Sequence, residues 1–336
     1  MQASTRWKQR PDGSNWGEFG PDDQSGRLNL LTPAKVRQGV AEVREGLSFC
    51  LSLPLDYPGG NALAPHRKPP QRQATQRQGR AFTNYGFSNE GNYSDCGCDD
   101  AVLLHTQYST QWDSLAHIGC SFDAMADGNE SYVYYNGYRA GLDVMSPDAG
   151  LGVSALGIEN MATTCVQGRA VMVDLQARFG DGRRYVGYDD LMRTMDECGA
   201  QLESGDILCL HTGFAQRVLD MQRQPDAEAL HQACAVLDGG DDRLLQWITD
   251  SNVAAIAADN YAIEGIPARL GASRRPFVPL HVHCLFKLGV HLGELWQLGE
   301  LNRWLKAHGR TRFLLTAPPL RLPGAAGSPV TPVGTV

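Results

Sequence analysis

The sequence predicts a single α/β domain built on a mixed central β-sheet. Short apolar segments alternate along the chain with helix-like stretches, which is the pattern of strands and helices packed around one sheet. No internal repeat and no low-complexity linker divides the chain into independent parts. A chain of 336 residues with 42% hydrophobic residues is also long enough to bury a full core. We therefore expect one large domain.

Residues 1–56 are predicted to form an N-terminal extension that ends in the first strand. After a loop rich in Gly, Asp and Trp, Thr32 and Pro33 are a typical N-cap and first helical residue. A helix is expected to follow over AKVRQGVAEVREG and to end at Gly46. The alternation in LSFCLSLPL then predicts a strand within residues 47–56.

Residues 57–98 form a long connection rich in Pro, Gln, Arg, Gly and Asn. Connections of this length usually carry function, so a lid or a substrate-facing loop is one interpretation. A poorly ordered excursion over the surface is the other, and both stay open at this point. The segment contains four aromatic residues, namely Phe82, Tyr85, Phe87 and Tyr93.

Residues 99–336 are predicted to hold the α/β core. Four apolar segments are expected to be strands: AVLLHTQYST, GRAVMVDLQ, GDILCLHTG and VAAIAADNYA. Three segments are expected to be helices: YDDLMRTMDECG, DDRLLQWITDSN and GELNRWLKAHG, the first and third of which close on Gly. The tail GAAGSPVTPVGTV is rich in Gly and Pro, and we expect it to run over a surface or a neighbouring subunit.

The composition excludes several classes of protein. The chain has 30 Lys+Arg against 37 Asp+Glu, a net charge of −7, and no basic face for nucleic acid is evident. No apolar run approaches the roughly 18–20 residues needed to cross a bilayer, and the polar N-terminus lacks a signal-peptide core. Nine cysteines, mostly within apolar segments, fit free buried thiols. We expect a cytoplasmic protein that binds neither nucleic acid nor membrane.

The densest polar cluster is HTQYSTQWDSLAH, residues 105–117. Gln111 and Asp113 are two residues apart, so a strand places both on one face. Asp113 and His117 are four apart, so a helical turn or a continued strand brings them together. A carboxylate, an amide oxygen and an imidazole beside an apolar strand can bind a divalent metal and activate water. The alternative is a buried polar network that only holds a loop.

A second cluster, HVHCLFKLGVHLGE, offers three imidazoles and a carboxylate within fourteen residues. The alternation of His281 and His283 predicts that both lie on one face of a strand. No HExxH or other named zinc spacing is present, and isolated His residues are more often packed than liganding. Two segments with His and carboxylate nevertheless favour one shared site.

A third cluster follows the predicted strand VAAIAA and runs from Asp259 and Asn260 to Glu264. It falls at the carboxyl end of a strand, where α/β sheets place ligand sites. A simple Asp/Asn turn is the slightly favoured alternative. No Walker A loop, GxSxG elbow or GxGxxG motif is present to indicate another chemistry.

The chain resembles the cyclase-family hydrolases, which include bacterial kynurenine formamidases, isatin hydrolases and metal-dependent dienelactone hydrolases. The signature H-x-G-T-H-x-D-x-P-x-H of that family is matched here by QYSTQWDSLAH. WGEFGPDD, GRLNLLTP, GRAVMVDL, SGDILCLHTGF, WITDSNVAAIAADNYAIEGIP and LHVHCLFKLGVHLGE also fall in family order. The resemblance covers nearly the whole chain. It implies a swivelling β/β/α domain that forms homodimers or homotetramers.

The resemblance also implies a site for one or two divalent metals. Carried over by position, Asp113 becomes a metal ligand and His117 the general acid/base. His281 and Glu294 match the later His and Glu of the family, while His283 replaces His281 if the strand register shifts. Glu294 is considered both as a catalytic residue beside His117 and as a further ligand.

This sequence departs from the signature where Gln107 and Gln111 replace histidines, and where Ser109 and Leu115 replace Gly and Pro. A glutamine offers a neutral carbonyl oxygen, which is a weaker zinc ligand than imidazole. We therefore predict one divalent ion per chain, with Mn²⁺ preferred and Zn²⁺ possible. Its predicted ligands are Gln111, Asp113 and His281.

Together these observations predict a metal-dependent hydrolase that acts on a small molecule. It is expected to open a cyclic amide or lactone, or to cleave an N-acyl amide, through metal-activated water. Two alternatives stay open: a silent binding relative that has lost its metal, and a metal-assisted dehydratase or cyclase. An apolar pocket for a planar substrate is expected to be lined by Trp16, Phe19, Phe82 and Tyr85.

Overall fold

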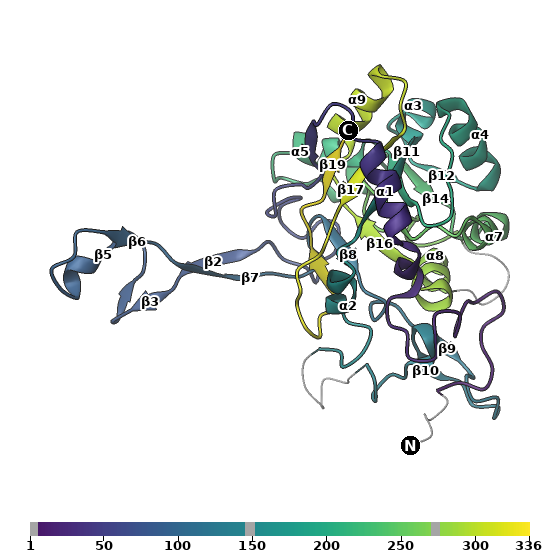
Figure 1. Ribbon diagram of the computed structural model, residues 1–336, viewed down its shortest axis with the longest axis horizontal. Helices are drawn as coiled ribbons and strands as arrows, with labels where there is room; N and C mark the ends of the chain where they lie inside the picture. The colour runs from purple at the N-terminus through teal and green to yellow at the C-terminus, as the bar shows by residue number, and fades with distance from the viewer. Residues whose placement is uncertain (1–5, 145–151, 270–275) are drawn as a thin grey trace.

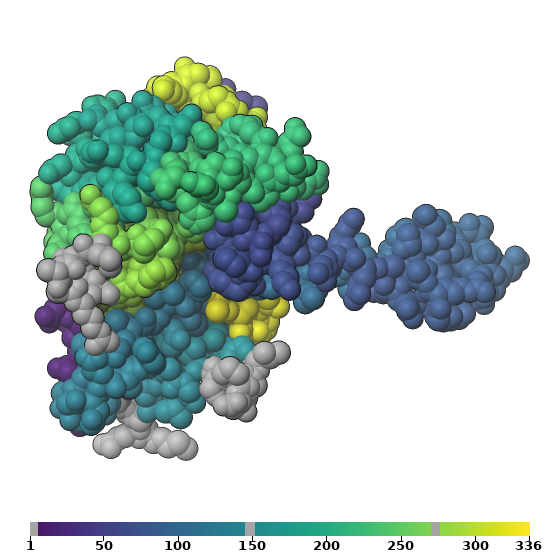
Figure 2. Space-filling view, turned by 180° about the vertical axis from the view of Figure 1, so that it is seen from behind, coloured from purple at the N-terminus to yellow at the C-terminus, as the bar shows by residue number. Residues whose placement is uncertain are grey.

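The computed structural model describes residues 6–144, 152–269 and 276–336. It is a rounded body from which one long β-arm projects (Figure 1), and the arm stands clear of the body from behind as well (Figure 2). A nine-stranded mixed sheet runs through the body. Its strands, in spatial order, are β1 (Ser48–Cys50), β19 (Val333–Thr335), β17 (Arg312–Thr316), β11 (Gln167–Asp174), β13 (Ile207–His211), β15 (Ala255–Ala258), β16 (His291–Glu294), β8 (Gln111–Asp113) and β18 (Gly327–Pro329).

Strands β11, β13, β15 and β16 are parallel to one another, and the strands outside them pair antiparallel. The prediction of an α/β domain with a mixed central sheet is confirmed. The α-helices are α1 (Pro33–Ala41), α2 (Ile158–Thr163), α3 (Leu175–Phe179), α4 (Tyr188–Cys198), α5 (Phe214–Asp220), α6 (Ala227–His231), α7 (Asp242–Ser251), α8 (Pro279–His281) and α9 (Gly299–Ala307). The described residues also form the 3₁₀-helices η1 (Gly26–Leu30), η2 (Phe87–Asn89) and η3 (Tyr135–Gly137) and the π-helix η5 (Val282–Leu288).

Each face of the sheet carries its own apolar core, because alternate residues of a strand point to opposite faces. On one face, Val171 and Val173 of β11 pack with residues of α4, α7 and η5. On the other face, Ala170 and Met172 pack with residues of α2 and α9. The two buried faces explain why these strands read as continuous apolar segments in the sequence. No helix within the described part of the chain is both long enough and apolar enough to cross a membrane.

Most predicted helices are present, with shifted ends. The Thr32 side chain accepts a hydrogen bond from the Lys35 amide and Pro33 opens α1, as predicted. The helix ends at Ala41, five residues before Gly46. Helix α4 ends where Gly199 adopts a left-handed conformation, as predicted from the sequence.

The prediction that LHVHCLFKLGV is a strand is wrong. Pro279 begins α8, η5 continues it, and Gly289 with positive φ ends it. A short apolar run does not distinguish a strand from a buried helix. His281 and His283 therefore point in different directions and do not share a strand face.

The Gly/Pro-rich tail does not run over the surface as predicted, because it supplies β18 and β19 to the sheet. Of the predicted strand AVLLHTQYST, only the first residues form β7 (Asp100–Leu103), and β7 belongs to the arm. The arm also contains β2 (Gln71–Ala74), β3 (Gln76–Arg77), β4 (Arg80–Ala81), β5 (Tyr85–Gly86) and β6 (Cys96–Gly97). Two small sheets elsewhere pair β9 (Cys120–Phe122) with β10 (Ser131–Val133) and β12 (Arg184–Val186) with β14 (Ala235–Leu237).

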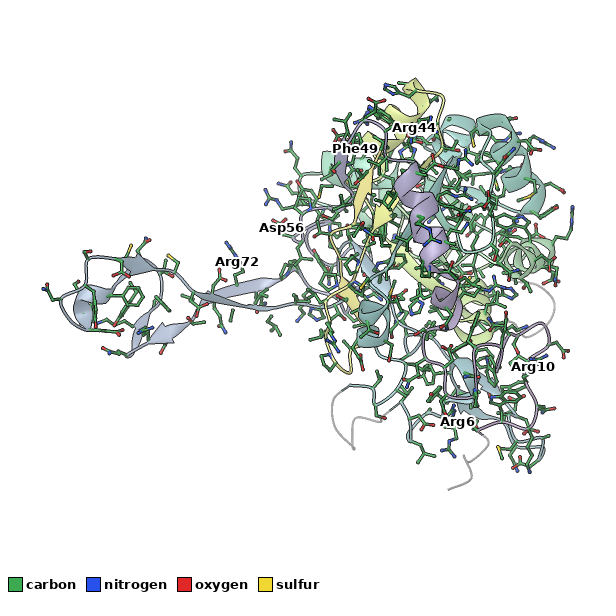
Figure 3. The ribbon with its side chains drawn as sticks, in the orientation of Figure 1. Arg6, Arg10, Arg44, Phe49, Asp56 and Arg72 are labelled. Atoms are coloured by element: carbon green, nitrogen blue, oxygen red, sulfur yellow. The ribbon has the colours of Figure 1, made fainter. Side chains whose placement is uncertain are left out.

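The segment 57–98, for which a lid and a surface excursion were both considered, divides into two parts. Residues 58–67 lie against the body, where several of them line a small cavity. The following residues, 71–103, leave the body as the two-stranded stem of the arm, in which Gln71 pairs with Leu103 and Ala74 with Asp100. Figure 3 shows Asp56 near the root of the arm and the Arg72 side chain projecting from its stem.

Candidate metal centre

Strand β8 places two of the predicted site residues on one face of the sheet. Gln111 lies opposite Glu294 of β16, and Trp112 lies opposite Gly293. Because side chains alternate along a strand, Gln111 and Asp113 share a face with Glu294, as the two-residue spacing predicted. Trp112 points to the other face, where it packs edge-on against Trp296 at 4.9 Å between ring centroids.

Asp113, His281 and Glu294 meet in the interior of the body. All three are buried, and their ligand atoms lie within 4.8 Å of one another. His281 Nε2 is 3.2 Å from Glu294 Oε1 and 4.0 Å from Asp113 Oδ2. Two carboxylates and one imidazole at such distances form a candidate metal site of mixed, mostly hard ligands.

Glu264 orients the His281 ring. It accepts hydrogen bonds from His281 Nδ1 at 2.7 Å and from the amides of Leu280 and His281 at 3.1 and 2.9 Å. With Nδ1 as the donor, Nε2 is the nitrogen that faces Asp113 and Glu294, which is the usual arrangement behind a metal-binding histidine. Burial lowers the pKa of His281, but hydrogen bonds to the two glutamates outweigh it and raise that pKa to about 10.

Two buried oxygens of this site have no hydrogen-bond partner among the described residues: Asp113 Oδ2 and Gln111 Oε1. A buried polar atom without a partner is unfavourable, so an orphaned oxygen requires a reason. Burial, followed by the nearby Glu294 carboxylate, raises the pKa of Asp113. Gln111 Nε2 donates to Glu294 Oε2 at 2.8 Å, which leaves the amide oxygen free. The residues present therefore fit a divalent cation.

Gln107 links Asp113 to His117. Its Nε2 donates to Asp113 Oδ1 at 2.7 Å and lies 2.8 Å from His117 Nδ1. His117 Nε2 is 3.8 Å from Asp113 Oδ1, and the two imidazoles of His117 and His281 are 6.4 Å apart between centroids. Burial lowers the pKa of His117, which favours the neutral imidazole. With Gln107 donating to Nδ1, the proton of the neutral ring lies on Nε2.

A cavity of about 20 Å³ opens beside Glu294, enough for about one water molecule. The guanidinium of Arg67 lines it and donates to the Gln107 carbonyl oxygen at 2.7 Å. The other lining residues are Pro58, Asn61, Leu63, Ala64, Gln107, Tyr108, Tyr261 and Leu295. Residues 58–67, rather than the arm, therefore cover the candidate site.

The structure brings five predicted residues together: Gln111, Asp113, His117, His281 and Glu294. His283 is elsewhere. Its Nε2 is 2.9 Å from the Thr249 hydroxyl, and burial lowers its pKa to about 4. The open choice between His281 and His283 is thus decided by geometry, since only His281 faces the two carboxylates.

The four aromatic residues predicted to line one substrate pocket do not meet within this chain. Trp16 is fully buried, and its indole N–H donates to the Phe286 carbonyl oxygen at 2.7 Å. Phe19 lies half-buried in the N-terminal loop. Phe82 and Tyr85 pack on each other in the arm, away from the body (Figure 1). The prediction fails because periodicity does not reveal the direction in which a long connection runs.

Sequence reasoning missed three contributors to the site. Glu264 belonged to a cluster for which a simple turn was the slightly favoured explanation, and its position after a parallel strand was the available signal. Gln107 was considered only as a lost metal ligand, although it positions Asp113 and His117. Nothing in the local sequence indicated a role for Arg67. Its place in the site depends on residues 58–67 folding back over β8, which no local pattern predicts.

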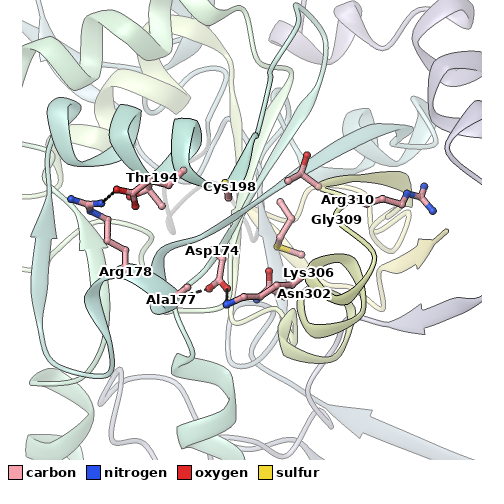
Figure 4. A pocket seen from close by; sticks show the side chains of 12 residues that line it. Asp174, Ala177, Arg178, Thr194, Cys198, Asn302, Lys306, Gly309 and Arg310 are labelled. Atoms are coloured by element: carbon pink, nitrogen blue, oxygen red, sulfur yellow. Dashed lines mark hydrogen bonds and ion pairs between the residues drawn. The ribbon is translucent and has the colours of Figure 1, made fainter.

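A larger cavity of about 340 Å³ lies between α4 and α9, away from the candidate metal centre, and none of its lining residues belongs to that centre (Figure 4). There Asp174 accepts from the Ala177 amide at 3.1 Å and lies 3.0 Å from His211 Nδ1. Burial raises the pKa of Asp174, but hydrogen bonds from His211 and Asn302 outweigh it and lower that pKa to about 2. These contacts join α3, β13 and α9, and they are separate from the candidate metal centre.

Comparison with known proteins identifies the family. A family model described as "Putative cyclase" matches residues 50–265, more than half of the chain. The chain is 29% identical to a protein solved as "a novel cyclase", with a TM-score of 0.76 and coverage of 96% of this chain and 97% of that one. Isatin hydrolase A from Labrenzia aggregata is 13% identical, with a TM-score of 0.56 and coverage of 90% and 97%. Isatin hydrolase A from Ralstonia solanacearum is 16% identical, with a TM-score of 0.54 and coverage of 90% and 95%.

No curated protein sequence matches the chain. The family model covers β8 with Asp113 and the segment that ends at Glu264, whereas His281 and Glu294 follow its matched residues. With this span matched, and with the same fold shared over nearly its full length, the chain belongs to the cyclase family.

Proposed function

We propose that this protein is a metal-dependent hydrolase that opens a small cyclic amide or lactone, or cleaves an N-acyl amide. The observation that carries the proposal is the buried cluster of Asp113, His281 and Glu294 with two orphaned oxygens beside it. Two structures that share the fold are named isatin hydrolases, and isatin is a cyclic amide, which supports this substrate class.

The proposed ligands of the cation are Asp113, His281 and the Gln111 oxygen, with Glu294 completing the set. Two carboxylates match the charge of one divalent ion, whereas a second ion would add two positive charges that neutral amide oxygens offset poorly. The donor set is mostly oxygen, which suits Mn²⁺ better than tetrahedral Zn²⁺. When bound, such a cation polarises a carbonyl oxygen and lowers the pKa of water.

His117 is the proposed proton-transfer residue. In the neutral ring Nε2 carries the proton and can donate a hydrogen bond, so His117 gives a proton to a leaving nitrogen or oxygen only after it has taken one from water and become imidazolium. To accept a proton at Nε2, the ring must first move its own proton to Nδ1. The Gln107 amide must then turn so that its oxygen, rather than its nitrogen, faces Nδ1. Gln107 is therefore proposed to control the proton state of His117.

Two further parts of the chain orient and cover the proposed metal ligands. Glu264 keeps His281 Nε2 directed at the two carboxylates. Residues 58–67 limit the space beside Glu294 to about one water molecule in this conformation, so substrate entry requires this segment to move. A small planar substrate is proposed to bind there, with Arg67 close to its developing negative charge.

The test is a substrate screen with protein loaded with Mn²⁺ or Zn²⁺, using aryl formamides, isatin-like lactams and unsaturated lactones. We expect hydrolysis that a chelator abolishes and that added metal restores. His117→Ala should keep its metal while kcat falls by about 10²–10⁴-fold, the usual contribution of a positioned acid/base. His283→Gln, a buried imidazole outside the site, is the matched control and should keep both metal and turnover.

The outcomes separate this proposal from the two alternatives. Failure to bind metal under every loading condition would overturn it in favour of a silent binding relative. A product formed by loss of water, rather than by its addition, would identify a dehydratase or cyclase. Loss of metal in His117→Ala would make His117 a ligand. Two tightly held zinc ions per chain would overturn the single-ion assignment.

A further inference from the structure

The segment that covers the candidate metal centre, residues 58–67, carries a single permanent charge. It contains no Asp, Glu or Lys, and Arg67 is its last residue. Arg67 is half-buried and lines the small cavity beside Glu294. The remaining described residues around this cavity are uncharged. A cationic side chain therefore faces the space in which the substrate is proposed to bind.

Most of the hydrogen-bond donors of Arg67 are free. Its Nη1 donates to the Gln107 carbonyl oxygen at 2.7 Å, and within the described chain this guanidinium forms no other hydrogen bond and no ion pair. Arg169 shows the contrast, because its guanidinium binds Asp206 through two hydrogen bonds at 2.9 and 2.8 Å. A guanidinium offers five N–H groups in a planar fork that fits a carboxylate. Arg67 thus has donors for a carboxylate that the described chain does not supply.

The charges of the proposed metal site leave Arg67 unbalanced. Burial raises the pKa of Glu294, but the hydrogen bond and charge of His281, followed by the charge of Arg67, outweigh it and lower that pKa. In the proposed metal-bound site, Asp113 and Glu294 together balance one divalent cation, so neither carboxylate remains to balance Arg67. The third carboxylate, Glu264, lies behind His281, where three N–H groups bind it. The completed site therefore presents a positive charge to the cavity.

We propose that the substrate carries a free carboxylate beside the amide or lactone bond that is cleaved, and that Arg67 binds this carboxylate through paired N–H donors. This inference rests on the proposed hydrolase function and narrows its substrates to anionic molecules. Hydrogen bonds between a guanidinium and a carboxylate are strong and directional, and water screens them less in a partly buried cavity. Arg67 is then a specificity-determining residue, and a neutral cyclic amide such as isatin is a poor substrate.

Two other sources of negative charge must be separated from a carboxylate of the substrate. Hydrolysis itself creates negative charge on the attacked carbonyl oxygen and then on the new acid. This charge arises with neutral and anionic substrates alike, so its effect cancels when two substrates are compared in one protein. A carboxylate that bound the cation directly would instead give a preference that substitution of Arg67 leaves unchanged.

A matched pair of substrates measures the preference. In ortho-formamidobenzoate a carboxylate lies beside the formamide, and in ortho-formamidobenzamide a neutral amide takes its place. In Mn²⁺ buffer, the ratio of the two kcat/KM values should favour the carboxylate in the wild type. That ratio should fall by about 10–100-fold in Arg67→Met, mainly through KM, because hydrogen bonds to a charged group are lost. Arg67→Lys should keep part of the preference, because it keeps the charge but not the fork.

Lys68→Met is the matched control. Lys68 is the next residue along the chain, is exposed and does not line the cavity. Its substitution removes the same unit of charge from the same region of the surface. We expect the preference for the carboxylate to remain in this variant, because a fully solvated charge contributes little to the binding of a ligand in the cavity. Thermal melts check that every variant is folded.

Binding of benzoate and of benzamide, measured by isothermal titration calorimetry in Mn²⁺ buffer, tests the same contact without turnover. The wild type should bind benzoate more tightly than benzamide. Arg67→Met should lose about tenfold or more of its affinity for benzoate, and Lys68→Met should not. Absence of all hydrolysis, together with binding of benzoate that depends on Arg67, would contradict the hydrolase function but not the carboxylate site.

Three results would each overturn the carboxylate site. Equal kcat/KM values for the two formamides in the wild type would do so and would leave the hydrolase function intact. A preference that persists unchanged in Arg67→Met would show that the cation or another group binds the carboxylate. An equal loss of preference in Lys68→Met and Arg67→Met would show that both charges act through solvent rather than by contact.

Discussion

Asp113 lies buried between His117 on one side and His281 and Glu294 on the other. Its Oδ2 lacks a hydrogen-bond partner within the described chain, and burial makes its ionised form unfavourable without a cation. The carboxylate proposed to bind a metal therefore destabilises the metal-free protein.

Asp113→Asn separates these two effects. We expect the variant to lose metal binding and activity, because the site loses an anionic ligand. We expect its metal-free form to melt at the same temperature as the metal-free wild type or above it, because an amide is buried at lower cost than a carboxylate. Calorimetric metal titration and thermal melts in chelator measure both effects. Turnover near the wild-type value in this variant would show that Asp113 is not a ligand of the catalytic metal.

His291 makes the stability of the protein depend on pH. It is buried at the start of β16, its Nδ1 has no partner among the described residues, and burial lowers its pKa to about 3. Below pH 6.5 the unfolded chain binds a proton at this residue while the folded chain does not. The stability is therefore lost as the pH falls from 6.5 toward 3, at about 1.4 kcal/mol per pH unit.

His291→Leu removes this dependence. Between pH 6.5 and 5, the unfolding free energy of the wild type should fall by about 2 kcal/mol more than that of the variant. Over these 1.5 pH units, only the unfolded wild type binds a proton at this position, and the variant has no group there to bind one. Urea unfolding of both proteins at the two pH values, in chelator, measures the difference. Parallel losses in the two proteins would show that His291 is protonated in the folded state.

Among the elements, α1 is fastened to the sheet by a buried ion network. Asp206, which precedes β13, accepts two hydrogen bonds from Arg169 of β11 at 2.9 and 2.8 Å and one from Lys35 of α1 at 3.0 Å. All three residues are buried. Without Asp206, the exposed carboxylate of Glu203 is the ionic partner left to Arg169 at 3.0 Å and to Lys35 at 3.5 Å, so two buried cations lose their buried counter-ion.

Asp206→Ala should lower the unfolding free energy by roughly 3–5 kcal/mol, because Arg169 and Lys35 lose their buried partner. Asp189→Ala is the control at the surface, where Asp189 pairs with Arg243 and both side chains are exposed. Asp189→Ala should lower the unfolding free energy by less than about 1 kcal/mol. Urea denaturation measures both variants. Equal losses would mean that the Asp206 network is hydrated in solution.

Across the whole molecule, the candidate metal centre joins three parts of the chain that are far apart in sequence. Asp113 comes from β8, His281 from α8, and Glu294 from β16. A ligand that binds only the folded state stabilises it by mass action, about 2.7 kcal/mol at a free concentration of 100 times Kd. Metal should therefore stabilise the fold as a whole.

Removal of metal should lower the melting temperature of the wild type, and added Mn²⁺ should restore it in proportion to the logarithm of its concentration. Asp113→Asn should show no such shift, because the centre is incomplete. Calorimetric scans at several Mn²⁺ concentrations measure this response. A shift of the same size in Asp113→Asn would place the stabilising metal at another site.

The sequence by itself determined what depends on neighbours along the chain. The alternation of apolar segments predicted the strands β11, β13 and β15, because a strand buried on both faces is apolar throughout. The two-residue spacing of Gln111 and Asp113 predicted a shared face, because side-chain direction in a strand has a period of two. Thr32 and Pro33 predicted the start of α1, because capping is a contact between near neighbours.

Only the tertiary structure decided what depends on contacts between distant segments. His281 and His283 have the same chemistry, and the helix through them selects the one that faces Glu294. Gln107 became a positioning residue because the fold places its amide between Asp113 and His117. The direction of residues 71–103 has no local cause that the sequence could show, since the hydrogen bonds and ion pairs of these residues are internal to the arm.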